Sequence, residues 1–221
     1  MTDFPRIRHP EWVERTSGEL RYSRDIAPDG VLIAKVLRCP HPAARLMKLD
    51  IAAARATPGV AAVLTGAMLP DRNYKDYGQY DRWPMVRDRS VYFGQEVAAV
   101  AAENETAAEA ALANIRVKWK PLAHASSVEE ALAPGAPAVH PDRAPDNVAT
   151  QAQRRFGDLE AARGRSTRRS SARYGCGPQH HCCMEQLSAT ASWDARNHRL
   201  DMWLPTQGPR NITGELAHML G

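Results

Sequence analysis

The clearest hydrophobic pattern in the chain is a run of small apolar side chains at residues 97–102. Such a run is typical of a strand that is covered on both faces. An alanine-rich stretch follows it to about Asn114 and predicts a helix, and Thr106 and Glu109 have the spacing of a capping box at its start. Residues 115–119 then alternate between apolar and polar side chains, which predicts a half-exposed strand. Strand, helix and strand within about thirty residues have the size of a βαβ crossover.

The residues just before this unit predict how the chain leads into it. Val91, Tyr92 and Phe93 are β-branched or aromatic, so we expect them to begin a strand. Gly94 interrupts that strand, and it indicates a bulge or a close approach of another backbone segment.

The N-terminal part of the chain alternates strand patterns with turn residues. We expect an irregular arm over residues 1–17 and a helix over 51–56 with Asp50 as its N-cap. Apolar and β-branched residues predict three further strands, at 31–38, 44–49 and 60–64. The stretch 71–89 is polar and aromatic and predicts a loop. Stacking of nucleic-acid bases is an alternative for its aromatic and Arg side chains, but its balanced charge favours an ordinary, partly packed loop.

The second half of the chain predicts a separate group of elements. A short helix is expected at 126–133, where Ser126 and Glu129, or Ser127 and Glu130, have capping-box spacing. Prolines recur between residues 134 and 146 and indicate a linker. After this linker we expect a hairpin and then a helix, at 189–194, 200–204 and 211–220.

One segment of this half, residues 163–177, lacks the apolar alternation found on either side of it. It reads RGRSTRRSSARYGCG, which is poor material for a strand. We expect either an exposed, disordered arm or the product of a local reading-frame error.

Positive charge is concentrated around the same segment. The whole chain has a net charge of +4, and seven arginines between residues 154 and 173 face only Asp158 and Glu160. Binding to nucleic acid would depend on this one segment. We expect no nucleic-acid partner, and an Arg-rich nucleic-acid binder is the least favoured alternative.

The four cysteines do not have the spacing of a zinc or iron–sulfur site. Histidines and cysteines at 180–183 are nearly contiguous, so they are poorly arranged to surround one ion, and we expect no metal site formed by this chain alone. No apolar run reaches the roughly 18 residues of a membrane helix, and residues 1–8 lack the apolar core of a signal peptide. These features predict a cytoplasmic protein without a membrane span.

The wording of the best-patterned region is that of a known family. The segment VYFGQEVAAVAAENETAAEAALANIRVKWKPL resembles the a/b hammerhead domain of the xanthine dehydrogenase and aldehyde oxidase family, which typically has Pro where this chain has Glu96 and Tyr where it has Trp119. The earlier segment LRCPHPAARLMKLDIAAARATPGVAAVLTG resembles the beginning of the same domain. The resemblance runs without a gap from about Gly18 to Leu122.

The resemblance implies an α+β fold with two parts. We expect a hammerhead domain followed by the beginning of an α+β molybdopterin-binding domain. Asn147 and the Phe156-Gly157-Asp158 sequence match the beginning of that second domain. The expected boundaries are an arm at 1–17, a hammerhead domain at 18–133, a linker at 134–146 and a first segment of the molybdopterin-binding domain at 147–221.

The resemblance also implies two cofactor-binding candidates. Thr206 and Gln207 match the Thr-Gln pair of the family, whose amide lies beside an oxo ligand of the molybdenum, and an amide NH₂ donates a hydrogen bond without adding charge. Glu185 matches a recurring glutamate near the cofactor region, although a buried, hydrogen-bonded structural carboxylate is the alternative. We expect no catalytic residue on this chain, because no group of base, nucleophile and oxyanion donors can be assembled from it.

The function implied by the resemblance is that of the N-terminal portion of a molybdenum hydroxylase catalytic subunit. Such an enzyme oxidises an aldehyde, a purine or another N-heteroaromatic compound with water as the oxygen source. The expected partners are a C-terminal molybdopterin-binding portion, an Fe-S subunit, an FAD subunit and a small-molecule substrate. The expected cofactor is molybdopterin, shared with that C-terminal portion. The alternative is a non-catalytic remnant or assembly module that packs on other subunits.

Overall fold

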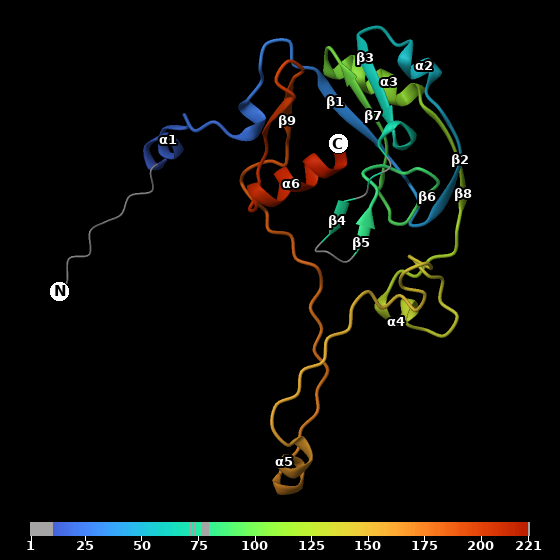
Figure 1. Ribbon diagram of the computed structural model, residues 1–221, viewed down its shortest axis with the longest axis vertical. Coiled ribbons are helices and arrows are strands. Elements are labelled where there is room, and N and C mark those ends of the chain that lie inside the picture. The colour runs from blue at the N-terminus through green and yellow to red at the C-terminus, as the bar shows by residue number, and fades with distance from the viewer. Residues whose placement is uncertain (1–10, 71, 73, 77–79, 221) are drawn as a thin grey trace, which may run out of the picture. The chain divides into compact units, whose positions relative to one another are not determined.

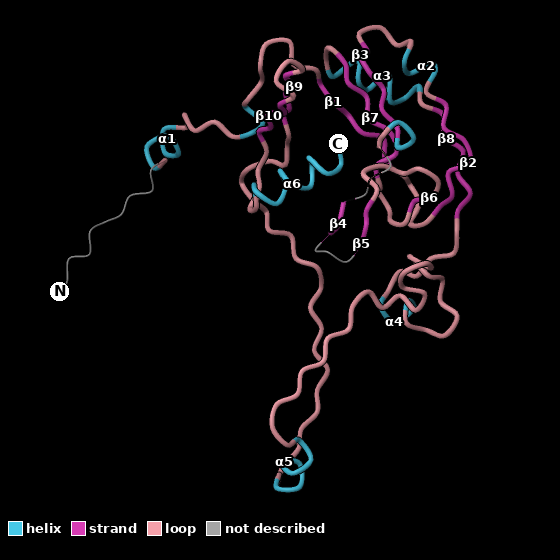
Figure 2. Tube along the Cα trace, in the orientation of Figure 1, coloured by secondary structure: helices cyan, strands magenta, loops and turns pink. Residues whose placement is uncertain are grey.

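The computed structural model describes residues 11–70, 72, 74–76 and 80–220. Its chain divides into two compact units, which are described separately. The first unit combines the residues up to Val31 with Arg173–Pro209, and the second combines Leu32–Ala172 with Arg210–Gly221. Figures 1 and 2 show the order of helices and strands in both.

A three-stranded antiparallel sheet forms the centre of the second unit. Strand β7 (Glu96–Ala102) lies between β1 (Ile33–Arg38) and β3 (Val60–Thr65). The helices α2 (Ala52–Arg55) and α3 (Glu105–Asn114) contact each other, and α3 contacts all three strands. The expected strand at 97–102 and the expected alanine-rich helix are both confirmed.

The main core of this unit lies between the sheet and the helices. Small side chains allow the helix backbone to approach the sheet closely, so alanine makes up most of this core. The fully or largely buried members are Ala54, Val63, Ala98, Val100, Ala102, Ala108, Ala111 and Ile115.

A second sheet contains β2 (Ala44–Asp50) between β6 (Arg89–Ser90) and β8 (Arg116–Pro121). The prediction of a βαβ crossover is therefore wrong, because β7 and β8 belong to different sheets. The physical reason is long-range pairing, since β8 forms its ladder with β2 and not with any strand of the first sheet. Helix α3 thus links two sheets.

The beginning of β7 also differs from the prediction. Val91–Phe93 is a loop, and Phe93 is 70% exposed. Gly94 has a positive φ of 85° and donates its N–H to the carbonyl of Cys39 at 2.9 Å. A side chain at Gly94 would meet nothing within 4 Å, so the glycine serves the turn and not a close approach. The register of β1 against β7 shifts between Leu37 and Arg38, just beyond that turn.

The starts of two helices lie at other residues than predicted. Asn104, not Thr106, is the N-cap of α3, and its side chain accepts from the N–H of Ala107 at 2.9 Å. Ile51 is the N-cap of α2, although Asp50 Oδ1 still accepts from the N–H of Ala52 at 3.2 Å. Asn and Thr are both good N-caps, so the position of the first helical residue decides between them.

Several connecting segments contain more structure than predicted. The stretch 71–89 includes the antiparallel pair β4 (Tyr74–Asp76) and β5 (Tyr80–Arg82), and residues 71, 73 and 77–79 lie outside the described part. The short helix η2 (Gly66–Met68) follows β3. Helix α4 (Val128–Ala131) has Ser127 as its N-cap, which confirms one of the two expected pairs.

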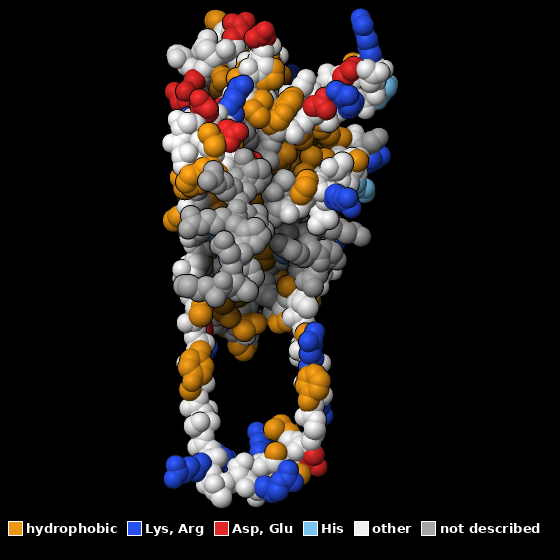
Figure 3. All heavy atoms as spheres, turned by 90° about the vertical axis from the view of Figure 1, so that its left-hand side faces the viewer, with side chains coloured by type: hydrophobic (Ala, Val, Ile, Leu, Met, Phe, Trp, Pro, Cys, Tyr) orange, Lys and Arg blue, Asp and Glu red, His pale blue; other side chains and the backbone are white. Residues whose placement is uncertain are grey.

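The segment around the arginines contains a helix that the sequence reasoning missed. Helix α5 (Leu159–Arg165) is capped by the Asp158 side chain, which accepts from the N–H of Ala161 at 2.9 Å. Lys and Arg side chains gather in this part, at the lower end of the view in Figure 3. From 166 to 189 the chain has neither helix nor strand, which agrees with an exposed arm at 166–177. Helix α6 (Pro209–Leu220) confirms the last predicted helix.

The first unit contains the predicted hairpin. Strands β9 (Thr190–Asp194) and β10 (Arg199–Trp203) pair in an antiparallel register. Hydrogen bonds from Asn197 lower the pKa of the Asp194 carboxyl in the turn between them. The arm prediction for 1–17 is wrong for α1 (Trp12–Ser17), a short helix, and η1 (Ser23–Asp25) follows it. Among the described residues, no helix has the length and apolar character needed to cross a membrane.

Candidate functional site

Glu185, the first of the two cofactor-binding candidates, holds the N-terminal segment of the first unit. Its Oε1 accepts a hydrogen bond from the backbone N–H of Ser23 at 3.2 Å, and its side chain is half-buried. Ser23 is itself buried, with 7% of its surface exposed. The carboxylate therefore satisfies a backbone donor that is largely withdrawn from water.

Three further contacts surround this hydrogen bond. The hydroxyls of Ser23 and Ser188 are 2.8 Å apart, and Thr190 donates its hydroxyl to the carbonyl of Ile26 at 3.0 Å. Arg24 also donates to the side chain of Gln186. Sequence reasoning missed Ser23, because a single serine in an irregular segment carries no pattern. Together these contacts fix residues 23–26 against the segment that leads into β9.

Gln207, the second candidate, lies between β10 and α6. Its side chain is exposed, and it forms no hydrogen bond with another described residue. The neighbouring Thr206 hydroxyl accepts from the N–H of Gly208 at 3.1 Å, which shapes the turn that carries the amide. The two described side chains of Glu185 and Gln207 belong to the same unit but do not hydrogen-bond to each other.

The histidine and cysteine cluster at 180–183 is exposed. His180 Nδ1 accepts from the N–H of Cys182 at 3.0 Å and lies 3.3 Å from its sulfur. All four cysteines are free thiols, and Cys39 is buried while the other three are exposed. Within the described part of the chain, no three His, Cys, Asp or Glu side chains gather in a way that could hold a metal ion.

Two family models match consecutive parts of the chain. The description "Aldehyde oxidase and xanthine dehydrogenase, a/b hammerhead domain" covers residues 17–123, and "Molybdopterin cofactor-binding domain" covers residues 139–221. The matches lie in the order that the sequence predicts.

Individual relatives agree with these models. The chain is 36% identical over 186 residues to a probable xanthine dehydrogenase protein of Bacillus subtilis (strain 168), a match that spans 84% of this chain and 24% of that protein. It is 28% identical over 208 residues to the nicotinate dehydrogenase large molybdopterin subunit of Eubacterium barkeri, with 94% of this chain and 48% of that protein covered. The chain thus spans a quarter to a half of the length of these relatives.

A solved structure shows the same fold. Quinoline 2-oxidoreductase from Pseudomonas putida 86 superimposes with a TM-score of 0.81 and 26% sequence identity, over 96% of this chain and 28% of that one. Sequence models, relatives and fold agree over nearly all of the chain. The chain therefore belongs to the xanthine dehydrogenase and aldehyde oxidase family of molybdenum hydroxylases, as an N-terminal part that contains the a/b hammerhead domain.

Proposed function

We propose that the chain is the N-terminal portion of a molybdenum hydroxylase catalytic subunit. Its reaction is the oxidation of an aldehyde, a purine or another N-heteroaromatic compound, with water as the source of oxygen. The observation that carries this proposal is the order of the two family matches, a hammerhead domain and then a molybdopterin-binding domain. The expected boundaries, 18–133, 134–146 and 147–221, remain part of the proposal.

The donor chemistry of Gln207 fits a molybdopterin cofactor. The cofactor, when bound, supplies the redox and oxygen-transfer chemistry, and the protein supplies position and electrostatics. An exposed amide without a hydrogen bond to the described residues has its NH₂ group available for such a group. Gln207 would hold the cofactor by a neutral hydrogen bond, which avoids adding charge beside the metal.

Glu185 fits a supporting position better than direct contact with an anionic cofactor. Like charges in a partly buried site repel each other, and its Oε1 is already used by Ser23. We propose that Glu185 anchors the first unit and thereby helps to place the loop that carries Gln207. Its second oxygen remains able to accept a donor from another segment.

The proposed partners follow from the family. A second molybdopterin-binding portion would complete the cofactor site, and an Fe-S subunit and an FAD subunit would receive the electrons. We further propose a reducing, cytoplasmic setting, which the four free thiols support.

An alternative function is that of a non-catalytic assembly module. It is favoured by large apolar side chains that stand almost fully in solvent. Phe156 is 88% exposed, Met184 is 91% exposed and Leu187 is 92% exposed. Exposed apolar groups of this kind mark surfaces that pack on another chain or segment. Such packing is needed for an enzyme complex and for an inactive scaffold alike.

Co-expression with the C-terminal molybdopterin-binding portion as a second chain tests the proposal. The catalytic function predicts a complex that retains molybdenum and oxidises aldehydes, purines or N-heteroaromatics in a dye-linked assay. Replacement of Gln207 by Ala should lower kcat about 10- to 100-fold while both chains still co-purify. Gln179→Ala, at an exposed position of the same unit, is the matched control and should leave kcat unchanged. A complex that assembles without turnover of any of these substrates would instead support the assembly module.

A further inference from the structure

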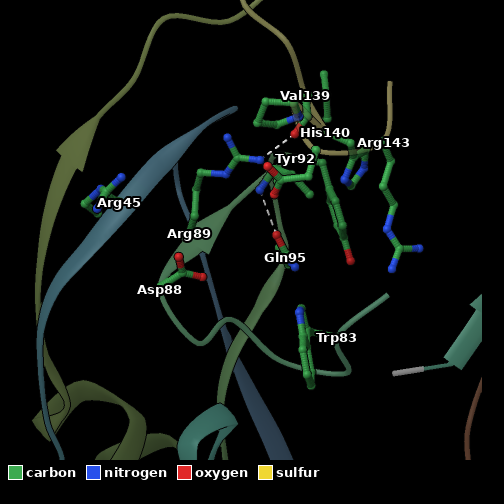
Figure 4. Close-up of a pocket in the computed structure, with 12 residues that line it drawn as sticks. Arg45, Trp83, Asp88, Arg89, Tyr92, Gln95, Val139, His140 and Arg143 are labelled. Carbon is green, nitrogen blue, oxygen red and sulfur yellow. Dashed lines mark hydrogen bonds between the residues drawn. The ribbon is translucent and has the colours of Figure 1, made fainter. Parts of the chain in front are cut away.

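A cavity in the second unit lies away from the residues considered so far. Its volume is about 780 Å³, which is in the range of small-molecule sites. It lies among the residues around β6, the turn before β7 and the segment 139–143 (Figure 4). Polar and apolar side chains both line it, among them Trp83, Tyr92, Gln95, Val139 and Arg143.

Gln95 places an unused hydrogen-bond donor at this cavity. Only 6% of the residue is exposed. Its Oε1 accepts from the N–H of Val91 at 2.8 Å, and this contact fixes the orientation of the amide. Its NH₂ group forms no hydrogen bond with another described residue, yet it is not sealed from solvent, because no fully buried side-chain nitrogen of the described residues lacks a partner. The free donor therefore faces the cavity.

Trp83 places a second donor opposite the first. Figure 4 shows the indole nitrogen of Trp83 pointing toward the Gln95 side chain. This indole N–H also forms no hydrogen bond with the described residues. The Arg87 guanidinium lies 3.9 Å from the centre of the Trp83 ring, which fixes the ring by a cation–π contact. Arg87 in turn donates to the carbonyls of Leu69 and Pro70 at 2.9 and 2.6 Å.

The charge around the cavity favours an anion. Three arginines line it, Arg45, Arg89 and Arg143, against the two carboxylates of Asp88 and Asp142. Arg89 is positioned by a hydrogen bond to the carbonyl of Val139. The lining therefore has an excess of one positive charge before His140 is considered, and oriented N–H donors and arginine suit a carboxylate.

We propose that this cavity binds a carboxylate group, which accepts hydrogen bonds from the Gln95 amide and the Trp83 indole. The two donors are held in place before a ligand arrives, so binding does not have to order them. The aromatic surfaces of Trp83 and Tyr92 favour a carboxylate that is attached to a planar or apolar body. Nothing in the Gln207 region enters this proposal.

The experiment uses the 221-residue chain and benzoate as the probe. Benzoate is titrated while the indole N–H signals are followed by NMR, and Trp83→Phe assigns the signal of Trp83. We expect a saturable shift of that signal and of the Gln95 side-chain NH₂ signals. Benzamide, which has the same shape without the charge, should bind at least about tenfold more weakly, because it lacks the charge-assisted hydrogen bonds. A blocked aspartyl dipeptide distinguishes the two sources of a carboxylate: stronger binding than that of benzoate assigns the cavity to an acidic side chain of a protein.

Gln95→Glu is the decisive variant. It keeps the shape of the side chain and the acceptor for Val91, but it replaces the free donor by a negative oxygen. Benzoate affinity should fall at least about tenfold, because the two carboxylates repel each other. Gln153→Glu makes the same charge change at an exposed position and should leave the affinity unchanged. The proposal is overturned if benzoate leaves the Trp83 signal unshifted, or if it binds equally well to Gln95→Glu whose remaining spectrum shows a native fold.

Discussion

The backbone N–H of Ser23 donates to the carboxylate of Glu185, 162 positions later in the chain, at 3.2 Å. This hydrogen bond joins a short N-terminal helix to the segment that leads into the C-terminal hairpin. It identifies a structural partner for a glutamate that sequence resemblance alone associates with the cofactor region. Both roles make predictions about substitutions at Glu185.

Replacement of Glu185 by Ala should release residues 23–26. The backbone donor of Ser23 would lose its acceptor, at a cost of about 0.5–1.5 kcal/mol. Hydrogen exchange of the peptide that contains Ser23 should therefore become faster. Glu185→Gln keeps an acceptor oxygen and should preserve most of the protection, and Glu19→Ala, at an exposed position of the same segment, is the control. Unchanged exchange in Glu185→Ala would show that this hydrogen bond does not hold the segment.

Asn104 and Thr106 make different contributions to the start of α3. The Asn104 side chain accepts the N–H of Ala107, so Asn104→Ala should lower the free energy of unfolding by about 1 kcal/mol. Thr106 is an exposed helix residue without a capping contact among the described residues. Thr106→Ala should therefore change stability by no more than about 0.5 kcal/mol. Urea denaturation of both variants measures the difference, and a larger loss in Thr106→Ala would contradict the observed helix start.

Gly66 lies too close to another segment to accept a side chain. A Cβ at this position would be 2.3 Å from the carbonyl oxygen of Val86. Gly66→Ala should therefore destabilise the second unit by about 1–3 kcal/mol. Gly164 in α5 meets nothing within 4 Å, so Gly164→Ala should leave stability unchanged or raise it by up to about 1 kcal/mol. Thermal unfolding of the two variants provides the comparison, and equal melting temperatures would rule out the close approach at Gly66.

Lys35 joins β1 to α3 through two carboxylates. Its ammonium lies 2.6 Å from Glu105 and 2.5 Å from Glu109, and hydrogen bonds from these groups raise the pKa of Lys35. A raised pKa means that the stabilisation is complete below the pKa of the unfolded chain and is lost as the pH rises through the pKa of the folded state. The difference in stability between the wild type and Lys35→Gln should therefore be constant at neutral pH and shrink above about pH 10. Lys118→Gln, an exposed lysine on β8, should show no such pH dependence.

The elements that sequence reasoning predicted well carry their pattern locally. The small apolar residues of β7 indicate burial on both faces, and the structure buries Val97 in one apolar cluster and Val100 in the other. The hairpin of β9 and β10 alternates in the same way along its own sequence. For such elements, neighbouring residues contain enough information to fix both type and position.

The features that were missed depend on residues far apart in the sequence. Pairing of Ala44 with Pro121 places β8 in the second sheet, and nothing near β8 announces its partner. Ser23 is part of the candidate site only because Glu185 meets it across the chain. Gln207 has no local signature either, since an exposed amide after a strand is common, and its candidacy comes from the family resemblance and remains a prediction.

The central claim is that this chain supplies one part of a molybdenum hydroxylase site, and metal analysis tests it most directly. The 221-residue chain is purified alone and together with the C-terminal molybdopterin-binding portion, and the molybdenum in each sample is measured. One neutral hydrogen bond contributes about 0.5–1.5 kcal/mol, far less than the roughly 8 kcal/mol of a micromolar complex. The account therefore predicts molybdenum in the two-chain complex and none in the isolated chain. Stoichiometric molybdenum on the isolated chain, or its absence from an assembled complex, would contradict the account.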